Sequence, residues 1–99
     1  MTDKDQELKA KLLAETARIP WRDLQRFFAQ GAVLQVEPEE DLIEAAIALA
    51  KDDKEIVNNL IENGKLQAPN DNTARHWYSS EAELWCVVVA PYVLVQDKA

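Results

Sequence analysis

The side chains of this sequence best suited to chemistry are three carboxylates and two arginines. The carboxylates are Glu15, Asp41 and Asp53, while Arg22 and Arg26 lie four residues apart, on one face of a helix. A buried carboxyl group can have a raised pKa and act as an acid or base, and paired arginines can hold an anion or an acidic peptide. These residues also have a structural interpretation, which we favour. The carboxylates and arginines can form structural ion pairs, and Asp53 suits the first turn of a helix.

Nucleophilic and metal chemistry have weaker support. Cys86 and His76 are the only cysteine and histidine, and Cys86 lies in an apolar run, where a thiol packs as a small hydrophobe with a raised pKa. One Cys and one His cannot complete a tetrahedral zinc site. The acidic residues from Glu37 to Glu44 lack a calcium-loop glycine and suit the start of a helix. The sequence therefore predicts no catalytic residue, no metal site and no cofactor.

Three tryptophans are many for so short a chain, and Trp21, Trp77 and Trp85 all have apolar neighbours. Core packing is the ordinary explanation for such residues. If one of them is exposed, it would be an anchor for a partner, because Trp and Arg are enriched in binding hot spots.

Charge and composition restrict the class of partner. The chain has 99 residues and a net charge of −7, whereas nucleic-acid binders and proteins of anionic membrane surfaces usually present a basic face. We therefore expect neither nucleic acid nor membrane as a partner. A single cysteine, and a charged N-terminus without the apolar core of a signal peptide, favour a reducing, cytoplasmic location.

Apolar periodicity and turn residues predict an alternation of helices and short strands. Pro38 starts the third helix, Asp52 caps the fourth, Asn70 or Asp71 caps the fifth, and Gly31 and Gly64 end two of them. The predicted helices cover 6–17, 21–30, 38–50, 52–63 and a short segment after 70, and the predicted strands cover 32–36, 65–68 and the apolar strip near the C-terminus.

The strip from Trp85 to Val95 has no charged residue. A strand with one solvent-exposed face alternates apolar and polar residues, whereas a continuous apolar run indicates burial on both faces. We predict a single α+β domain over 1–99, with 1–5 frayed, in which about three strands centred on the C-terminal strand are packed by four or five helices. Because such a core is modest, we expect a homodimer that uses the apolar sheet face or the strand edge near Pro91.

The tail Val87–Gln96, together with Trp21, Leu24, Phe28-Ala29 and Asp52-Asp53-Lys54, resembles a bacterial family of domains of unknown function, number 2288. The resemblance covers about residues 8 to 96. It implies relatives for this chain but no activity, substrate or cofactor.

Two functional hypotheses follow, and the sequence favours a non-enzymatic function over an enzymatic one. The first is a non-enzymatic interaction or accessory protein with an unidentified protein partner, which uses Trp and Arg side chains and an apolar surface. The alternative is a small-molecule or anion binder, or an enzyme, that uses the carboxylates and arginines named above. The alternative requires those charged groups to converge in one pocket, whereas the first hypothesis requires an apolar patch.

Overall fold

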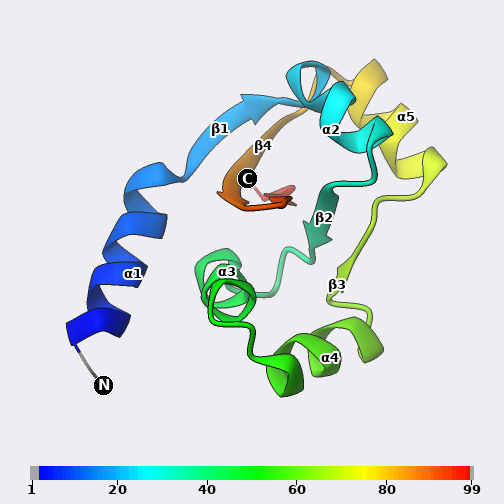
Figure 1. Cartoon of the computed structure of the whole chain (residues 1–99). Coiled ribbons are helices and arrows are strands. Elements are labelled where there is room, and N and C mark those ends of the chain that lie inside the picture. Colours follow the sequence, from blue (N-terminus) through cyan, green and yellow to red (C-terminus); the bar gives the residue numbers. More distant parts are fainter. Residues whose placement is uncertain (1–2, 99) are drawn as a thin grey trace.

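A sheet with helices on both of its faces forms the centre of this protein in the computed structural model, which describes residues 3–98 (Figure 1). The elements, in chain order, are α1 (Asp3–Glu15), β1 (Ala17–Pro20), the 3-10 helix η1 (Trp21–Leu24), α2 (Gln25–Ala29), β2 (Val33–Val36), α3 (Leu42–Ala50), α4 (Lys54–Glu62), β3 (Leu66–Gln67), α5 (Asp71–Ser79), β4 (Glu83–Val89) and β5 (Tyr92–Gln96).

The sheet has five strands in the order β1-β4-β5-β2-β3. Only β2 and β5 are parallel, with Val33 opposite Val93; the other neighbours are antiparallel. This confirms the α+β class, but the prediction of about three strands was wrong. The sequence predicts a helix end and an interruption where β1 lies, and it predicts one strand where β4 and β5 form two.

The apolar strip is a hairpin, not one strand. All of β5 pairs with β4, from Trp85 opposite Gln96 to Val89 opposite Tyr92. Ala90-Pro91, joined by a cis peptide bond, form the turn. Proline suits this position because it has no N–H to lose from the ladder. The strip is still central, because β4 and β5 are the second and third strands of the order.

Each face of the hairpin has its own hydrophobic core, so the prediction of burial on both faces is confirmed. Along β5 the side chains alternate: Leu94 packs under α1 and α3, while Val93 and Val95 pack against η1, α2 and α5. Two covered faces remove the apolar–polar alternation that a half-exposed strand would show.

The ends of the helices differ in detail from the predicted ones. Asp53, not Asp52, caps α4, and Asp52 instead has a φ of 52°. The acidic segment before α3 is a turn, in which Glu40 N–H donates to Glu37 O at 3.0 Å, and α3 begins only at Leu42. Of the two predicted caps of α5, Asn70 is the N-cap and Asp71 is the first residue of the helix.

The two glycines, Gly31 and Gly64, have φ values of 73° and 70° just after α2 and α4. Left-handed backbone of this kind terminates helices and favours glycine, which confirms both predicted helix ends. Of the segment predicted to fray, residues 3–5 belong to α1, and residues 1–2 lie outside the described part of the chain.

Candidate functional site

An apolar groove lies over the α4 side of the sheet, near its β3 edge. Its volume is about 460 Å³, which is within the ordinary range of ligand pockets. The side chains around it are apolar apart from the Gln67 amide and the Tyr92 hydroxyl. The groove is lined by Leu34, Leu49, Val57, Ile61, Leu66, Gln67, Ala68 and Tyr92.

Local structure explains how these residues meet. Val57 and Ile61 are four residues apart in α4, so they share one face of the helix. Leu34 and Val36 point to the same face of the sheet, and Val36 is opposite Leu66 in β3. The floor of the groove is therefore the sheet and its wall is α4.

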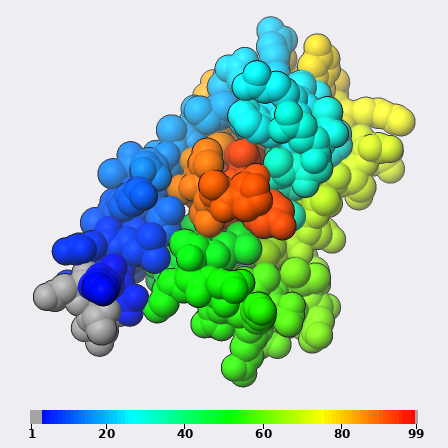
Figure 2. Space-filling view, in the orientation of Figure 1, coloured from blue at the N-terminus to red at the C-terminus, as the bar shows by residue number. Residues whose placement is uncertain are grey.

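The rim of the groove is apolar and exposed. Ile61 is 53% exposed and Tyr92 is 37% exposed, whereas Leu66 on the floor is buried. Tyr92 begins β5 at the tip of the hairpin, where Val88 is exposed on the other face of the sheet. Figure 2 shows part of the hairpin, coloured orange to red, at the surface between α2 and α3. Exposed apolar residues beside a concave apolar surface are typical of a binding region.

The carboxylates singled out in the sequence mainly serve helix ends. Asp41 Oδ1 accepts hydrogen bonds from the backbone N–H groups of Ile43 (2.9 Å) and Glu44 (3.2 Å), and Asp53 Oδ1 accepts one from Ile56 at 3.3 Å. Glu15 is exposed at the last position of α1.

The arginines lie apart from these carboxylates. Arg22 pairs with Glu81 at 3.3 Å on the surface, and the Arg26 guanidinium is 5.2 Å from the ring centroid of its neighbour Phe27. Arg22, Asp41 and Asp53 line three different hollows. The structure therefore does not bring these candidate residues together in one pocket.

The tryptophans divide into two kinds. Trp21 and Trp77 are buried in the core between the sheet, η1 and α5, with ring centroids 5.0 Å apart in an edge-to-face arrangement. Trp85 is half-buried, and the Arg18 guanidinium lies 5.5 Å from its ring centroid. Only Trp85 is therefore in part accessible to a partner.

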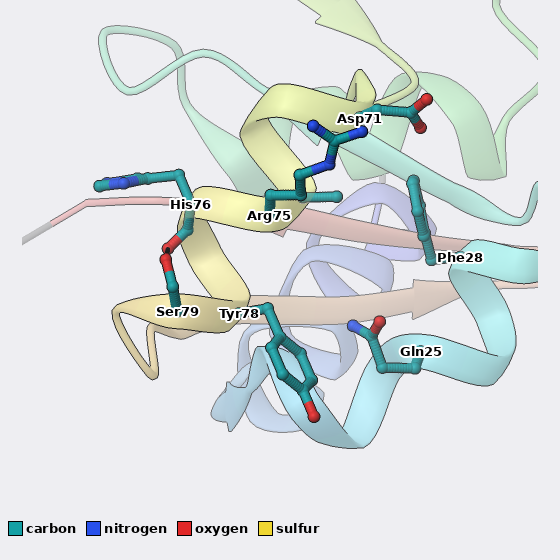
Figure 3. A pocket seen from close by; sticks show the side chains of 8 residues that line it. Gln25, Phe28, Asp71, Arg75, His76, Tyr78 and Ser79 are labelled. Atoms are coloured by element: carbon teal, nitrogen blue, oxygen red, sulfur yellow. Dashed lines mark hydrogen bonds between the residues drawn. The ribbon is translucent and has the colours of Figure 1, made fainter.

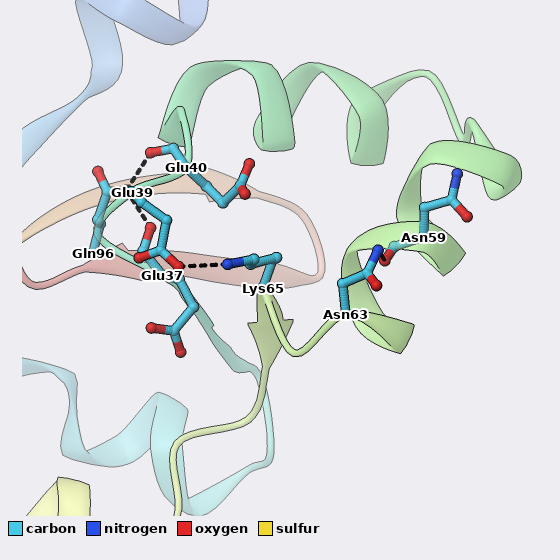
Figure 4. Close-up of polar contacts among 7 residues, drawn as sticks. All are labelled: Glu37, Glu39, Glu40, Asn59, Asn63, Lys65 and Gln96. Atoms are coloured by element: carbon cyan, nitrogen blue, oxygen red, sulfur yellow. Dashed lines mark hydrogen bonds and ion pairs between the residues drawn. The ribbon is translucent and has the colours of Figure 1, made fainter.

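A polar network holds the turn before α3 (Figure 4). Gln96 is 3% exposed, and its Nε2 donates to the backbone carbonyls of Glu37 (2.9 Å) and Glu40 (2.7 Å). Lys65 Nζ pairs with Glu39 on the surface; this contact lowers the pKa of Glu39 and raises the pKa of Lys65. The network is structural, because the Gln96 amide is committed to backbone oxygens.

The thiol and the imidazole are far from a catalytic arrangement. Cys86 is buried between sheet and helices, and this burial raises its pKa to about 11, which keeps the thiol protonated at neutral pH. His76 lies on the exposed side of α5. Within residues 3–98, no three His, Cys, Asp or Glu side chains are grouped closely enough to hold a metal ion.

A second hollow, between α2 and α5, has mixed chemistry (Figure 3). Its volume is about 940 Å³, and it is open to solvent. Gln25 of α2 faces Tyr78 of α5, and Phe28 of α2 lies on the side of Asp71 and Arg75, which are one helical turn apart in α5. No local pattern indicates this hollow, because its residues come from two separate short helices.

The sequence did not predict the apolar groove either, although it predicted the helix that forms the wall of the groove. The sequence predicts the helix over 52–63, but its pattern does not indicate that Val57 and Ile61 line a groove. The groove lies beside β3, which has only two residues, and Ile61 of α4 is 53% exposed there.

These features define an α+β domain with an apolar groove beside an edge strand. The chain belongs to the family described as "Protein of unknown function (DUF2288)", whose model matches residues 7–97. The NMR solution structure of PA1075 from Pseudomonas aeruginosa is similar: it is 46% identical, the match covers 100% of this chain and 92% of that chain, and the TM-score is 0.82. The comparison with curated proteins gave no match. Among the described residues, no helix combines the length and the apolar character needed to cross a membrane.

Proposed function

We propose that this chain is a non-enzymatic interaction protein of the cytoplasm, and that it binds a protein partner through the apolar groove. The observation that carries the proposal is the combination of a concave apolar floor with an exposed apolar rim at Ile61 and Tyr92. Removing such a surface from water is favourable by a free energy of about 25 cal/mol per Å² of apolar area. A partner that inserts an apolar side chain therefore obtains binding energy without any catalytic group.

Charge indicates the kind of partner. The net charge of −7 attracts basic segments and repels acidic ones. Glu62 is exposed beside Ile61 in α4, whereas Lys65, the neighbouring cation, is already paired with Glu39. We therefore assign the groove to a segment that carries both apolar and basic side chains.

Self-association is the second candidate, and the position of the exposed rim favours it. In a two-fold dimer, Ile61 and Tyr92 of each copy would enter the groove of the other, because a groove flanked by its own apolar side chains is self-complementary. Repulsion between two copies of charge −7 opposes such a dimer, most strongly at low salt.

The alternative of an anion binder or an enzyme has less support. It would need Arg22 or Arg26 to share a pocket with Glu15, Asp41 or Asp53, but Asp41 and Asp53 cap helices and Arg22 pairs with Glu81.

A matched pair of variants tests the proposal. Ile61→Gln removes an apolar rim residue, and Leu13→Gln on α1 is its control, because the two side chains are 53% and 52% exposed. The probe is a fluorescein-labelled, C-terminally amidated peptide, Lys-Leu-Lys-Leu-Lys, and the measurement is fluorescence anisotropy. We expect the wild type and Leu13→Gln to bind with the same Kd, and Ile61→Gln to bind about tenfold more weakly.

An equal Kd for Ile61→Gln and wild type, or no binding to wild type, contradicts the proposal. Sedimentation velocity of the same three proteins tests the second candidate. A dimer that only Ile61→Gln dissociates supports self-association, and a monomer in all three contradicts it.

A further inference from the structure

We propose that the partner segment binds as an extended strand on the free edge of β3, so that the sheet gains a sixth strand and the segment places alternate apolar side chains against α4. This inference rests on the proposed function of the groove and adds the backbone geometry of the partner. In recognition by strand addition, main-chain hydrogen bonds supply affinity and side-chain pockets supply specificity.

The position of β3 supports this geometry. It is the last strand of the order β1-β4-β5-β2-β3, and it pairs only with β2, through Gln35 opposite Gln67 and Val36 opposite Leu66. Its other edge has no strand beside it within the described residues. An unpaired edge presents backbone N–H and C=O groups that a second chain can pair with.

The groove and the edge are parts of one surface. Leu66 and Gln67 form the edge strand β3 and also line the groove, together with the next residue, Ala68. A strand added there would lie about 4.8 Å from β3, and every second side chain would point to the face that α4 covers. On that face the exposed Ile61 and the half-buried Val57 are the first apolar contacts available.

The opposite edge of the sheet lacks this combination. β1 is also an edge strand, and Ala17, Arg18 and Pro20 are exposed there. However, the hollow beside Pro20 contains Arg22, Asp23, Glu81 and Glu83, so a strand added to β1 would find charged side chains in place of an apolar groove. The edge of β3 is therefore the better site.

The charge of the chain restricts the added strand further. Apolar residues must alternate with others that point away from α4, and the net charge of −7 favours basic residues at these positions. The segment is thus one with the pattern basic–apolar–basic–apolar–basic, which the peptide Lys-Leu-Lys-Leu-Lys represents.

The experiment compares this peptide with two N-methylated isomers. Successive N–H groups of a strand point to opposite sides, so methylation of the amides of residues 2 and 4 blocks one edge, and methylation of residues 1, 3 and 5 blocks the other. We expect one isomer to bind wild-type protein like the parent peptide and the other to bind about tenfold more weakly, because it loses its hydrogen bonds to β3. The peptide Glu-Leu-Glu-Leu-Glu should also bind more weakly than the parent.

The outcomes separate the two proposals. If both isomers bind like the parent peptide, or if both lose affinity equally, the strand geometry is wrong while the groove remains a binding site. If the parent peptide itself does not bind, the proposed function fails as well.

Discussion

The indole Nε1 of Trp77 donates a 3.1 Å hydrogen bond to Asp97 Oδ2, and thereby ties α5 to the residue that follows β5. Trp21, whose ring packs edge-to-face against Trp77, has a buried Nε1 without an acceptor among the described residues. The two tryptophans are thus alike in burial but opposite in hydrogen bonding.

Substitution of each tryptophan by phenylalanine should expose this difference. Both variants lose packed volume in the same core. Trp77→Phe also loses a hydrogen bond, whereas Trp21→Phe removes an unsatisfied N–H, so we expect Trp77→Phe to lower the free energy of unfolding more, by about 1–3 kcal/mol. Urea denaturation measures both values, and an equal or reversed order would contradict this account of the core.

Gln96 should be more important for stability than its place near the C-terminus suggests. Its Nε2 supplies a donor to two backbone carbonyls of the turn before α3. Gln96→Leu leaves these oxygens without that donor, and we expect a loss of about 1–3 kcal/mol in the free energy of unfolding. Gln6→Leu on the exposed side of α1 is the control, with an expected change near zero. Similar values for the two variants would show that the network is not stabilising.

Because of the Cys86 thiol, the free energy of unfolding should depend on pH in the alkaline range. Burial raises its pKa from 9.0 to about 11, so between these values the folded protein keeps a proton that the unfolded chain has lost. Stability from this group is therefore complete below about pH 9 and falls as the pH rises toward 11. Thermal unfolding of wild type and Cys86→Ala from pH 7 to pH 11 isolates the effect. Parallel curves over this range would exclude it.

Two neighbouring aspartates at the start of α4 should differ in their contribution to stability. Asp53→Ala should lower the free energy of unfolding by about 1 kcal/mol, because it removes the side-chain acceptor at the N-cap. Asp52→Gly should be neutral or stabilising, since glycine accepts the φ of 52° without strain. Chemical denaturation of the two variants provides the comparison. A larger loss for Asp52→Gly would mean that the cap was misassigned.

Local patterns predicted much of the fold because each depends on nearby residues. The strand at 32–36, the short strand near Leu66 and the helix ends at Gly31 and Gly64 all follow from side-chain preferences over a few positions. The strip from Trp85 to Val95 was harder, because its apolar run indicates double burial but not a reversal of the chain. β1 was missed because it has four residues, ends in Pro20 and is mostly exposed.

The groove could not be predicted, because it depends on how far apart α4, β3 and the hairpin lie. Val57 and Ile61 have the spacing of core residues, yet Ile61 is 53% exposed beside the two-residue strand β3. For two charged candidates the sequence predicted a place in the first turn of a helix, whereas the structure makes both Asp41 and Asp53 the N-cap residue instead. The ion pair between Arg22 and Glu81 joins residues 59 positions apart, which no local pattern reveals.

The most direct test of the groove as the binding surface is a ¹H–¹⁵N NMR titration of wild-type protein with Lys-Leu-Lys-Leu-Lys. We expect saturable shifts of the backbone amides of Leu34, Ile61 and Gln67, with little change at Arg75 and Tyr78 in the hollow between α2 and α5. Shifts centred on that hollow, or no saturable shifts at all, would contradict the assignment of the apolar groove as the site of partner binding.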